Sequence, residues 1–326
     1  MAQGILFLSG TDLDALGLSV VEIVPLLEAM FRHKAAGRTV MPPKIFFHRD
    51  GPQFYSAMAS ASATLGYAGC KWQSGDPENT ARGLPYIQGL YILNEDLTGQ
   101  PVAVMDAKWI TAHRTAAASA LAAKYLARSD AHVLAILGCG LQGRRNLEAL
   151  AGTLPSIARC QAYDIDPQRE DHYVAEMNRR FGIEVVAARS AQAAAQDADI
   201  VITAGPIEAI RRPTLRPEWL SPGCLTITLD YDSYITDAAI AAMDLVVTDD
   251  RDQLEDARVQ EGKFTGVTRI DAELAELVSA RKQGRRNNQQ RILAFNLGIA
   301  LEDLITGIEL LERARASNIG ISLPAD

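Results

Sequence analysis

Residues 132–150 read HVLAILGCGLQGRRNLEAL, and this stretch decides the fold. The five consecutive apolar residues at 133–137 predict a strand that is buried on both faces, as in a parallel sheet. Three glycines follow in Gly-x-Gly-x-x-Gly spacing, and residues 141–150 then have the apolar spacing of a helix. A strand, a glycine-rich turn and a helix in this order are typical of the phosphate-binding turn of a Rossmann fold.

Each glycine of this turn has a physical role in dinucleotide binding. Gly138 permits a tight turn, Gly140 lets the backbone approach a pyrophosphate, and Gly143 lets the helix pack closely on the strand. Leu141 and Gln142 begin the helix, where N–H groups without helical partners can bind phosphate oxygens. The sequence therefore predicts that these five residues bind a dinucleotide.

Two carboxylates further along the chain indicate which dinucleotide is bound. Asp164 follows a second predicted strand at 160–163, at about the distance from the glycines expected for an acid that binds the adenosine ribose. Asp166 lies two residues further on. Because two carboxylates repel a 2′-phosphate, the sequence favours NAD over NADP.

Strands and helices alternate regularly after this unit. Further strands are expected at 184–187, 199–203, 224–229 and 245–248. This alternation predicts an α/β Rossmann domain with a doubly wound parallel sheet. Ligands of such sheets bind beyond the carboxyl ends of the strands, which makes Thr203 and Ala204 further cofactor-binding candidates.

The first hundred residues have a different pattern, in which strands are separated by turns. The strands are expected at 1–8, 44–48, 54–59, 67–72, 84–94 and 101–106. One turn is expected around Asp50-Gly51, between the second and third of these strands. The pattern predicts a mostly antiparallel α+β domain.

Two long helices are expected outside the strand-rich region. The first is alanine-rich and covers 109–128, with Thr111 as its cap, so that Arg114 would lie in the first turn. The second covers 292–315. We predict a substrate-binding and dimerisation domain at 1–115 with 300–326, and an NAD-binding Rossmann domain at 116–299.

Composition excludes several classes of protein. The hydrophobic fraction of 48% and the charged fraction of 22% are typical of a soluble globular protein. The net charge of −8, without a basic stripe, argues against a nucleic-acid partner. The sequence shows no long apolar run and no leader pattern, so we expect no membrane partner and a cytoplasmic location. The four cysteines and five histidines lack metal-ligand spacing, and no metal site is expected.

Several motifs distributed over nearly the whole chain carry a family resemblance. They are MPPK at 41–44, GCKW at 69–72, ARGLPYIQGL at 81–90, TAHRTAAASALAAKYLAR at 111–128, GCGLQG at 138–143, VTDDRDQ at 247–253 and LGIALEDL at 297–304. Together they resemble the ornithine cyclodeaminase and mu-crystallin family, and the first two are most similar to its alanine dehydrogenase branch. The resemblance implies a homodimer whose Rossmann domain binds NAD or NADP. It also implies hydride transfer between an amino acid and its imine, which some members close into a ring with release of ammonia.

The resemblance also assigns roles to individual residues. Lys71 matches the active-site lysine, and burial would lower the pKa of its ammonium so that it can exchange protons near neutrality. Arg114 matches the arginine that binds the substrate carboxylate, and Lys44 lies where many members have another such arginine. Asp232 matches the catalytic aspartate, but the surrounding residues depart from the family pattern, so that Asp230 remains an alternative.

A further departure concerns the substrate. The ornithine-specific pattern has an acid shortly before Met58, where this chain has Ser56-Ala57. We therefore predict an NAD-dependent oxidoreductase that interconverts an L-amino acid and its imine or 2-oxo acid, of the alanine dehydrogenase or ketimine (pyrroline-2-carboxylate) reductase type. Two alternatives remain. One is an ornithine cyclodeaminase-type ammonia lyase that uses NAD catalytically, and the other is a crystallin-like protein that binds a nucleotide without turnover.

Overall fold

The computed structural model describes residues 4–49, 53–208 and 210–324. The chain forms two compact units. Unit 1 comprises Met1–Arg114 and Ile299–Asp326, and unit 2 comprises Thr115–Gly298. Both boundaries fall one residue earlier than the sequence suggested. The turn expected around Asp50-Gly51 lies outside the described residues.

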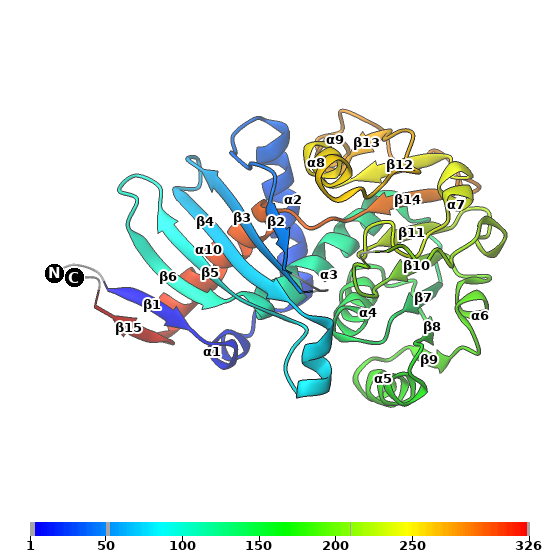
Figure 1. The fold of residues 1–326 in the computed structure, drawn as a ribbon, viewed down its shortest axis with the longest axis horizontal. Helices are drawn as coiled ribbons and strands as arrows, with labels where there is room; N and C mark the ends of the chain where they lie inside the picture. The colour runs from blue at the N-terminus through cyan, green and yellow to red at the C-terminus, as the bar shows by residue number, and fades with distance from the viewer. Residues whose placement is uncertain (1–3, 50–52, 209, 325–326) are drawn as a thin grey trace. The chain divides into compact units, whose positions relative to one another are not determined.

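Unit 1 is built on a seven-stranded sheet in the order β15-β1-β6-β5-β4-β3-β2 (Figure 1). The strands are β1 (Ile5–Leu8), β2 (Ile45–His48), β3 (Phe54–Ser62), β4 (Tyr67–Gly75), β5 (Ile87–Glu95), β6 (Pro101–Asp106) and β15 (Ile321–Leu323). Neighbouring strands are antiparallel except for β1 and β6, which are parallel. The prediction of a mostly antiparallel sheet is confirmed.

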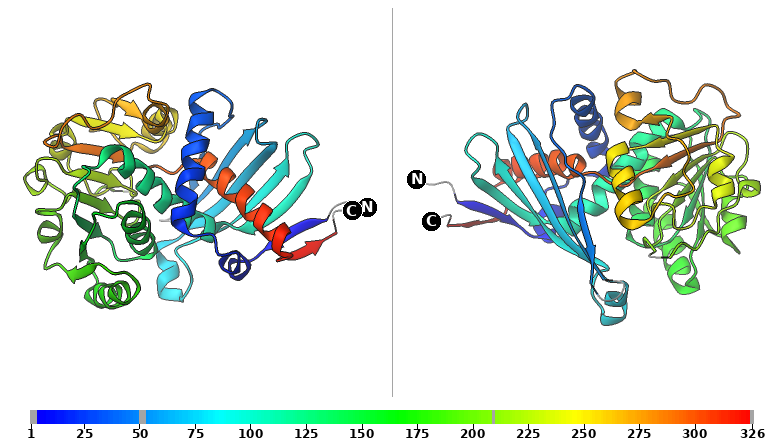
Figure 2. Two further views of the ribbon diagram at one scale, coloured as in Figure 1. Left: turned by 180° about the vertical axis from the view of Figure 1, so that it is seen from behind. Right: turned by 45° about the horizontal axis from the view of Figure 1, so that its top comes forward.

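Two helices cover one face of this sheet (Figure 2). The helices of unit 1 are α1 (Gly10–Ala15), α2 (Val20–Ala35), the 3₁₀ helix η1 (Pro77–Arg82) and α10 (Ala300–Ser317). Helix α10 packs on β3, β4 and β5, and α2 packs on α10. Because side chains alternate along a strand, Lys71 of β4 points toward the helices and is buried, whereas its neighbour Trp72 is 46% exposed on the opposite face.

Helix α3 (Ala107–Leu126) begins earlier than the sequence suggested. The carboxylate of Asp106 accepts the N–H of Trp109 at 2.9 Å, as the cap of a helix does. The prediction that Thr111 caps this helix is therefore wrong, because the last residue of β6 already supplies the cap. Arg114 lies in the interior of α3 and not in its first turn, so the helix dipole does not explain why an arginine is there.

Unit 2 is built on an eight-stranded sheet in the order β13-β12-β14-β11-β10-β7-β8-β9. The strands are β7 (Val133–Leu137), β8 (Arg159–Tyr163), β9 (Glu184–Ala187), β10 (Ile200–Thr203), β11 (Leu225–Thr228), β12 (Leu245–Thr248), β13 (Ala272–Glu273) and β14 (Ile292–Phe295). All neighbouring strands are parallel. This doubly wound sheet confirms the predicted fold class.

Unit 2 begins with the part of α3 from Thr115 onward, and its other helices follow the strands as crossover connections. They are α4 (Leu141–Thr153), α5 (Pro167–Arg180), α6 (Ala191–Ala195), the 3₁₀ helix η2 (Pro217–Trp219), α7 (Asp237–Ala241), α8 (Arg251–Glu261) and α9 (Leu274–Val278). Asp166 caps α5 and Ser190 caps α6 through side-chain oxygens. The strand order changes direction between β7 and β10, and it is at the carboxyl ends of such a pair of strands that sheets of this kind bind their ligands.

The region after residue 291 corrects a sequence prediction. We expected one helix from 292 to 315, but β14 occupies Ile292–Phe295 and α10 begins only at Ala300. All four residues of β14 are buried, and the strand pairs with β11 on one side and β12 on the other. A short apolar run of this kind fits a buried strand and a buried helix equally well, and only the sheet decides between them.

Candidate active site

The glycine-rich turn of unit 2 lies at the point where the strand order changes direction. Gly138 has φ +114°, and a Cβ added to it would lie 2.7 Å from the carbonyl oxygen of Ala204, at the end of β10. A Cβ on Gly143 would overlap the carbonyl oxygen of Gly138. Gly140 differs, because a Cβ there would meet no atom within 4 Å. The packing of the turn thus requires Gly138 and Gly143, whereas Gly140 borders open space that a phosphate can approach.

The start of α4 fits the same ligand. Its cap residue is Gly140, which provides no side-chain oxygen for the N–H groups of the first turn. Leu141 follows and is 48% exposed. The N-terminus of a helix carries a partial positive charge, and its N–H groups bind anions. A pyrophosphate therefore fits between Gly140 and the first turn of α4.

The predicted ribose-binding carboxylates lie beside this turn. Asp164 accepts the N–H of Cys139 at 2.8 Å and the N–H of Asp166 at 3.0 Å, so that it fixes the glycine turn from the end of β8. Asp166 accepts the N–H of Gln168 at 3.0 Å and caps α5. The guanidinium of Arg169 lies 3.8 Å from Asp164 and 3.7 Å from Asp166. Both carboxylates thus have structural contacts of their own.

Asp230 lies at the same edge of the sheet, after β11. Its carboxylate accepts the hydroxyl of Thr203 at 2.7 Å and the N–H of Gly205 at 3.1 Å. The side chain is fully buried, and burial raises the pKa of Asp230 to about 7 although both hydrogen bonds oppose this. Near neutral pH, this carboxyl group can therefore gain or lose a proton.

Asp232 is held by a different part of unit 2. Its carboxylate accepts the N–H of Phe264 at 2.8 Å and lies 3.2 Å from Nε of Arg211. It is also fully buried. The two aspartates that sequence reasoning could not separate therefore have different partners. Asp230 is bonded to the end of β10, beside the glycine turn, whereas Asp232 is bonded to the segment that follows α8.

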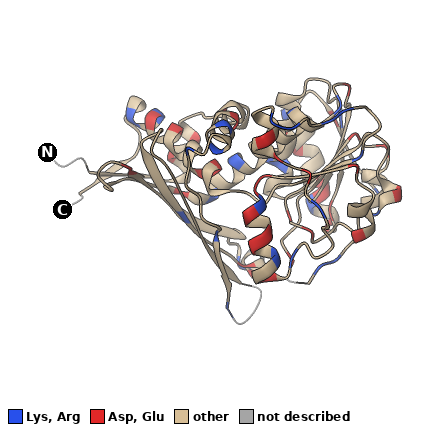
Figure 3. Ribbon diagram, turned by 90° about the horizontal axis from the view of Figure 1, so that it is seen from above, with Lys and Arg blue, Asp and Glu red and all other residues tan. Residues whose placement is uncertain are grey.

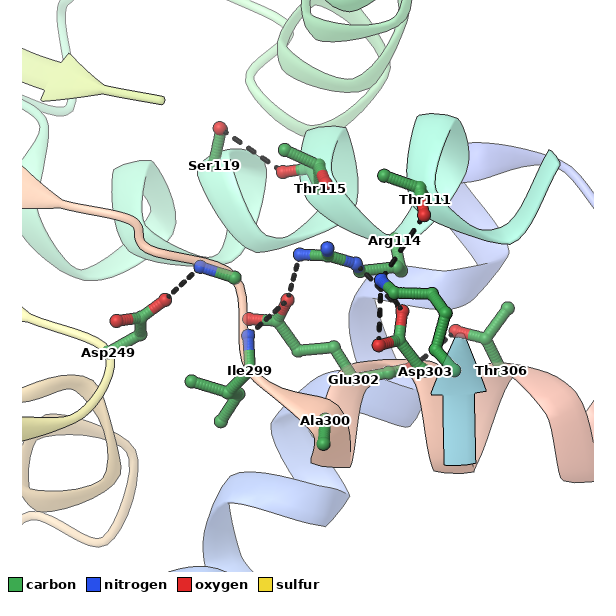
Figure 4. Close-up of polar contacts among 12 residues, drawn as sticks. Thr111, Arg114, Thr115, Ser119, Asp249, Ile299, Ala300, Glu302, Asp303 and Thr306 are labelled. Carbon is green, nitrogen blue, oxygen red and sulfur yellow. Dashed lines mark hydrogen bonds and ion pairs between the residues drawn. The ribbon is translucent and has the colours of Figure 1, made fainter. Parts of the chain in front are cut away.

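Unit 1 contains a cluster of four buried charged side chains, which we call the charge cluster (Figure 4). Nζ of Lys71 donates to Asp303 at 2.9 Å and to the hydroxyl of Thr111 at 3.2 Å. Arg114 donates from Nε to Asp303 at 3.0 Å and from Nη1 to Glu302 at 2.8 Å. At most 5% of each of the four side chains is exposed.

Burial changes the protonation of this cluster. Desolvation lowers the pKa of Lys71 to about 8, and the positive charge of Arg114 acts in the same direction, while Asp303 and Glu302 oppose both. Burial raises the pKa of Glu302, which the charge of Arg114 opposes. Lys71 can therefore exchange a proton close to physiological pH, as a group that acts on an amine or imine must.

Five buried polar atoms in the charge cluster or on the adjoining strands have no hydrogen-bond partner. They are Oγ of Ser56, Oε1 of Gln73, the hydroxyl of Tyr91, Oε1 of Glu302 and Oδ2 of Asp303, although Oδ2 of Asp303 lies 2.9 Å from Nζ of Lys71. In the strand register Ser56 is opposite Gln73, and Tyr91 is opposite Lys71. Because Lys71 and Gln73 are two residues apart on β4, these four side chains lie on one face of the sheet. An unpartnered buried polar group costs about 1–3 kcal/mol, and so this face is suited to a small polar ligand.

Other predicted residues are less informative. Lys44 lies one residue before β2 and is partly exposed, outside the charge cluster.

Within the described residues, no three His, Cys, Asp or Glu side chains are grouped to hold a metal ion. None of the helices in the described ranges is long and apolar enough to cross a membrane.

Sequence reasoning missed Glu302 and Asp303. Both lie in the LGIALEDL motif, which contributed to the resemblance, but neither was assigned a role. Two adjacent acids in the otherwise mostly apolar stretch at 299–308 were an available signal, because a buried carboxylate needs a cation or several donors nearby. Lys71 and Arg114 are those cations.

Comparison with known proteins identifies the family. A family model described as the ornithine cyclodeaminase/mu-crystallin family matches residues 7–318. The chain belongs to this family. Alanine dehydrogenase of Archaeoglobus fulgidus is 31% identical over 323 residues, which cover 97% of each chain. The resemblance carried by the motifs is confirmed, including its similarity to an alanine dehydrogenase.

Solved structures of family proteins have the same fold. The structure of Thermococcus litoralis Δ(1)-pyrroline-2-carboxylate reductase in complex with NADH and L-proline matches with a TM-score of 0.88 at 30% identity, covering 98% of this chain and 100% of that chain. An archaeal alanine dehydrogenase dimer with bound NAD matches with a TM-score of 0.87 at 30% identity, covering 98% of each chain.

The glycine turn yields a paired prediction. Gly143→Ala should lower the free energy of unfolding by about 1–3 kcal/mol, because the new methyl group meets backbone that cannot move aside. Gly140→Ala should change it by less than about 0.5 kcal/mol, because the methyl group enters open space, but it should weaken binding of the predicted dinucleotide. Urea unfolding and a fluorescence titration with NADH measure the two effects. Equal loss of stability in both variants would contradict the assignment of Gly143 to packing and of Gly140 to the approach of a phosphate.

Proposed function

We propose that this family member is an NAD-dependent oxidoreductase that interconverts an L-amino acid and its imine or 2-oxo acid. The observation that carries the proposal is the burial of Lys71 and Arg114 together around Asp303, with unpartnered polar groups on the sheet face that carries Lys71. The glycine turn of unit 2, which fits a dinucleotide, supports it, as do the two similar structures that contain NADH or NAD. When bound, the cofactor supplies or accepts the hydride at the substrate's α-carbon.

Arg114 binds the substrate carboxylate in this proposal. A guanidinium is planar and presents donors in a fixed fork that matches a carboxylate. Asp303 and Glu302 hold Nε and Nη1 of Arg114, so that the orientation of the fork is fixed before substrate arrives. Lys44 is the second candidate for the carboxylate, as a point charge without the fork.

Lys71 exchanges a proton with the substrate nitrogen. Its amine is buried and has a pKa of about 8, so that both protonation states are accessible. As an ammonium it donates a proton in the direction of imine reduction. As a neutral amine it accepts one in the direction of amino-acid oxidation.

We assign the proton-handling carboxylate of unit 2 to Asp230 in preference to Asp232, which the resemblance favours. Asp230 is bonded to Thr203 and Gly205 at the edge that carries the glycine turn, and its pKa of about 7 allows a proton to be exchanged. Asp232 instead accepts the N–H of Phe264, and so it organises the segment that starts there.

NAD is the preferred cofactor. Asp164 is buried beside the glycine turn and Asp166 lies next to it, so that two negative charges oppose a 2′-phosphate. Arg169 lies near both carboxylates and reduces their combined charge. The preference is therefore for NAD without complete exclusion of NADP.

The exposed face of the unit 1 sheet suits a second copy of the chain. Its exposed apolar side chains include Ile45, Phe47, Trp72, Leu90 and Ile92. The rings of Phe47 and Tyr55 stack at 5.6 Å between centroids, and those of Tyr55 and Trp72 at 5.8 Å. Figure 3 shows that the strands of this sheet carry few charged residues. A large apolar patch of this kind marks an interface, and we assign it to the homodimer.

The function is tested by following NADH with purified protein. One panel combines NADH, ammonium and 2-oxo acids, with pyrroline-2-carboxylate added, and the other combines NAD with alanine, proline, arginine or ornithine. We expect turnover in at least one panel. Lys71→Ala should reduce it by about a hundredfold or more, because a positioned acid–base group contributes that much. Lys124→Ala, which removes an exposed lysine of α3, is the matched control.

Two outcomes of this assay would contradict the proposal. Release of ammonia and proline from ornithine without net NADH would identify a cyclodeaminase. NADH binding without turnover on any substrate would identify a nucleotide-binding protein. In both cases the assignment of a net redox reaction is wrong.

The pKa of Lys71 predicts opposite pH dependences for the two directions. For imine reduction, kcat/KM should fall as pH rises through about 8, because the donating ammonium is lost. For amino-acid oxidation, kcat/KM should rise through the same range, because the neutral amine appears. Initial rates across the pH range measure both limbs, and limbs that run in the same direction would exclude Lys71 as the proton-exchanging group.

The dimer is tested at Trp72. Trp72→Glu places a carboxylate in the centre of the apolar patch, and we expect the protein to become a monomer by light scattering after size exclusion. Leu97→Glu is the control, because Leu97 is 91% exposed in the turn after β5, away from the patch. A Trp72→Glu protein that remains dimeric would place the interface elsewhere.

A further inference from the structure

One carboxylate contacts both cations to which the proposed function gives a role. Oδ1 of Asp303 accepts hydrogen bonds from Nζ of Lys71 at 2.9 Å and from Nε of Arg114 at 3.0 Å. Glu302, the adjacent acid, accepts Nη1 of Arg114 at 2.8 Å. Figure 4 shows Glu302 and Asp303 side by side on α10, both facing Arg114 of α3. The two acids therefore differ in what they hold.

The shared oxygen limits how far apart the two cations can be. Since both bonds end on Oδ1 of Asp303, Nζ of Lys71 and Nε of Arg114 cannot be separated by more than the two bond lengths, 2.9 Å plus 3.0 Å. An α-amino or α-imino acid carries its nitrogen and its carboxylate on the same carbon. A short spacing suits such a molecule better than one with the nitrogen several carbons away.

The position of Asp303 is itself fixed by the packing of α10. The hydroxyl of Ser60 on β3 donates to the carbonyl of Ala300 at 2.9 Å, which ties the start of the helix to the sheet. Asp303 follows three residues later and is fully buried where α10 packs on β3, β4 and β5. The carboxylate therefore belongs to a rigid element, whereas Lys71 and Arg114 have long, flexible side chains.

Asp303 also offsets the repulsion between the two cations. The charge of Arg114 lowers the pKa of Lys71, and both the charge and the hydrogen bond of Asp303 raise it. The adjacent Glu302 also raises the pKa of Lys71, and Asp303 raises that of Glu302. Tyr91 and Cys70 lie near Asp303 as well, and both are neutral at physiological pH because their pKa values are raised, mainly by burial. Without Asp303, the ammonium of Lys71 would keep its cationic neighbour but lose its carboxylate acceptor.

We propose that Asp303 is a positioning residue of the active site, which sets the spacing of Lys71 and Arg114 and thereby selects substrates with nitrogen and carboxylate on one carbon. The inference rests on the proposed function and deepens it. Of the two cations, Glu302 is hydrogen-bonded only to Arg114. The pair Asp303→Asn and Glu302→Gln separates the two roles, because each substitution removes one charge and keeps the shape of the side chain.

The first experiment does not depend on activity. The ¹³Cε signal of Lys71 is titrated in protein labelled at lysine and assigned by its absence in Lys71→Arg. Asp303→Asn should lower the midpoint by about one pH unit or more, because an adjacent carboxylate stabilises the ammonium by this amount. Glu302→Gln should lower it by clearly less. Equal midpoints in Asp303→Asn and the unchanged protein would overturn the inference, whether or not the protein is an oxidoreductase.

The second experiment measures kinetics with the substrate found in the assay panels. Asp303→Asn should raise KM about tenfold or more, lower kcat and shift the pH limb, whereas Glu302→Gln should raise KM without a comparable shift. Asp303→Glu keeps the charge but lengthens the side chain, so it should restore the pH limb but leave KM high. If Asp303→Asn does not fold, the KM of Asp303→Glu still tests whether Asp303 sets the spacing. Normal KM in Asp303→Glu would show that spacing is not controlled here. The two experiments can also disagree. If Asp303→Asn lowers the Lys71 midpoint as expected but the unchanged protein shows no turnover, the proposed function is rejected while the effect of Asp303 on Lys71 stands.

Discussion

The ion pairs of Lys71 and Arg114 with Asp303 and Glu302 determine how unit 1 is built. Taking a single charge out of water costs several kcal/mol, so that each of the four side chains requires its partner. Removing one member of such a group typically costs about 3–5 kcal/mol, because the remaining charge stays buried. The acids are on α10 and the cations on β4 and α3, so that the chain must leave unit 1 and return to it before the cluster is complete.

The two units provide binding groups in different ways. Unit 1 uses side-chain charges, which must be paired and whose protonation responds to burial. At the glycine turn, unit 2 uses backbone N–H groups and the start of α4, which are polar at every pH. This division explains why the candidate site of unit 1 depends on residues far apart in the sequence, whereas most of that in unit 2 lies within one short stretch.

The sequence predicted the local features of the fold well. The bounds of β6, β7, β9 and β12 agree with the expected ranges, because each is an apolar or β-branched run with clear turn residues around it. The glycine turn was also predictable, since its spacing directly reflects backbone requirements. The cap of α3 was not, because Asp106 serves as the last residue of a strand and the cap of a helix at once.

Features that depend on distant residues could not be predicted. Nothing local shows that Ile292–Phe295 is a strand, because its partners are β11 and β12. Nothing local pairs Glu302 and Asp303 with Lys71 and Arg114, which lie about 190 to 230 residues earlier in the chain. Asp230 and Asp232 look equivalent in sequence, and only their partners Thr203 and Phe264 distinguish them.

The place of β14 between β11 and β12 has a consequence for protein synthesis. On the ribosome, β11 and β12 emerge before the strand that joins them, and the 43 residues between Thr248 and Ile292 take on the order of several seconds to translate. During this time two unpaired, apolar strand edges are available to other nascent chains. The growing polypeptide thus exposes these edges late in its translation, when a chaperone that shields strand edges would be of use.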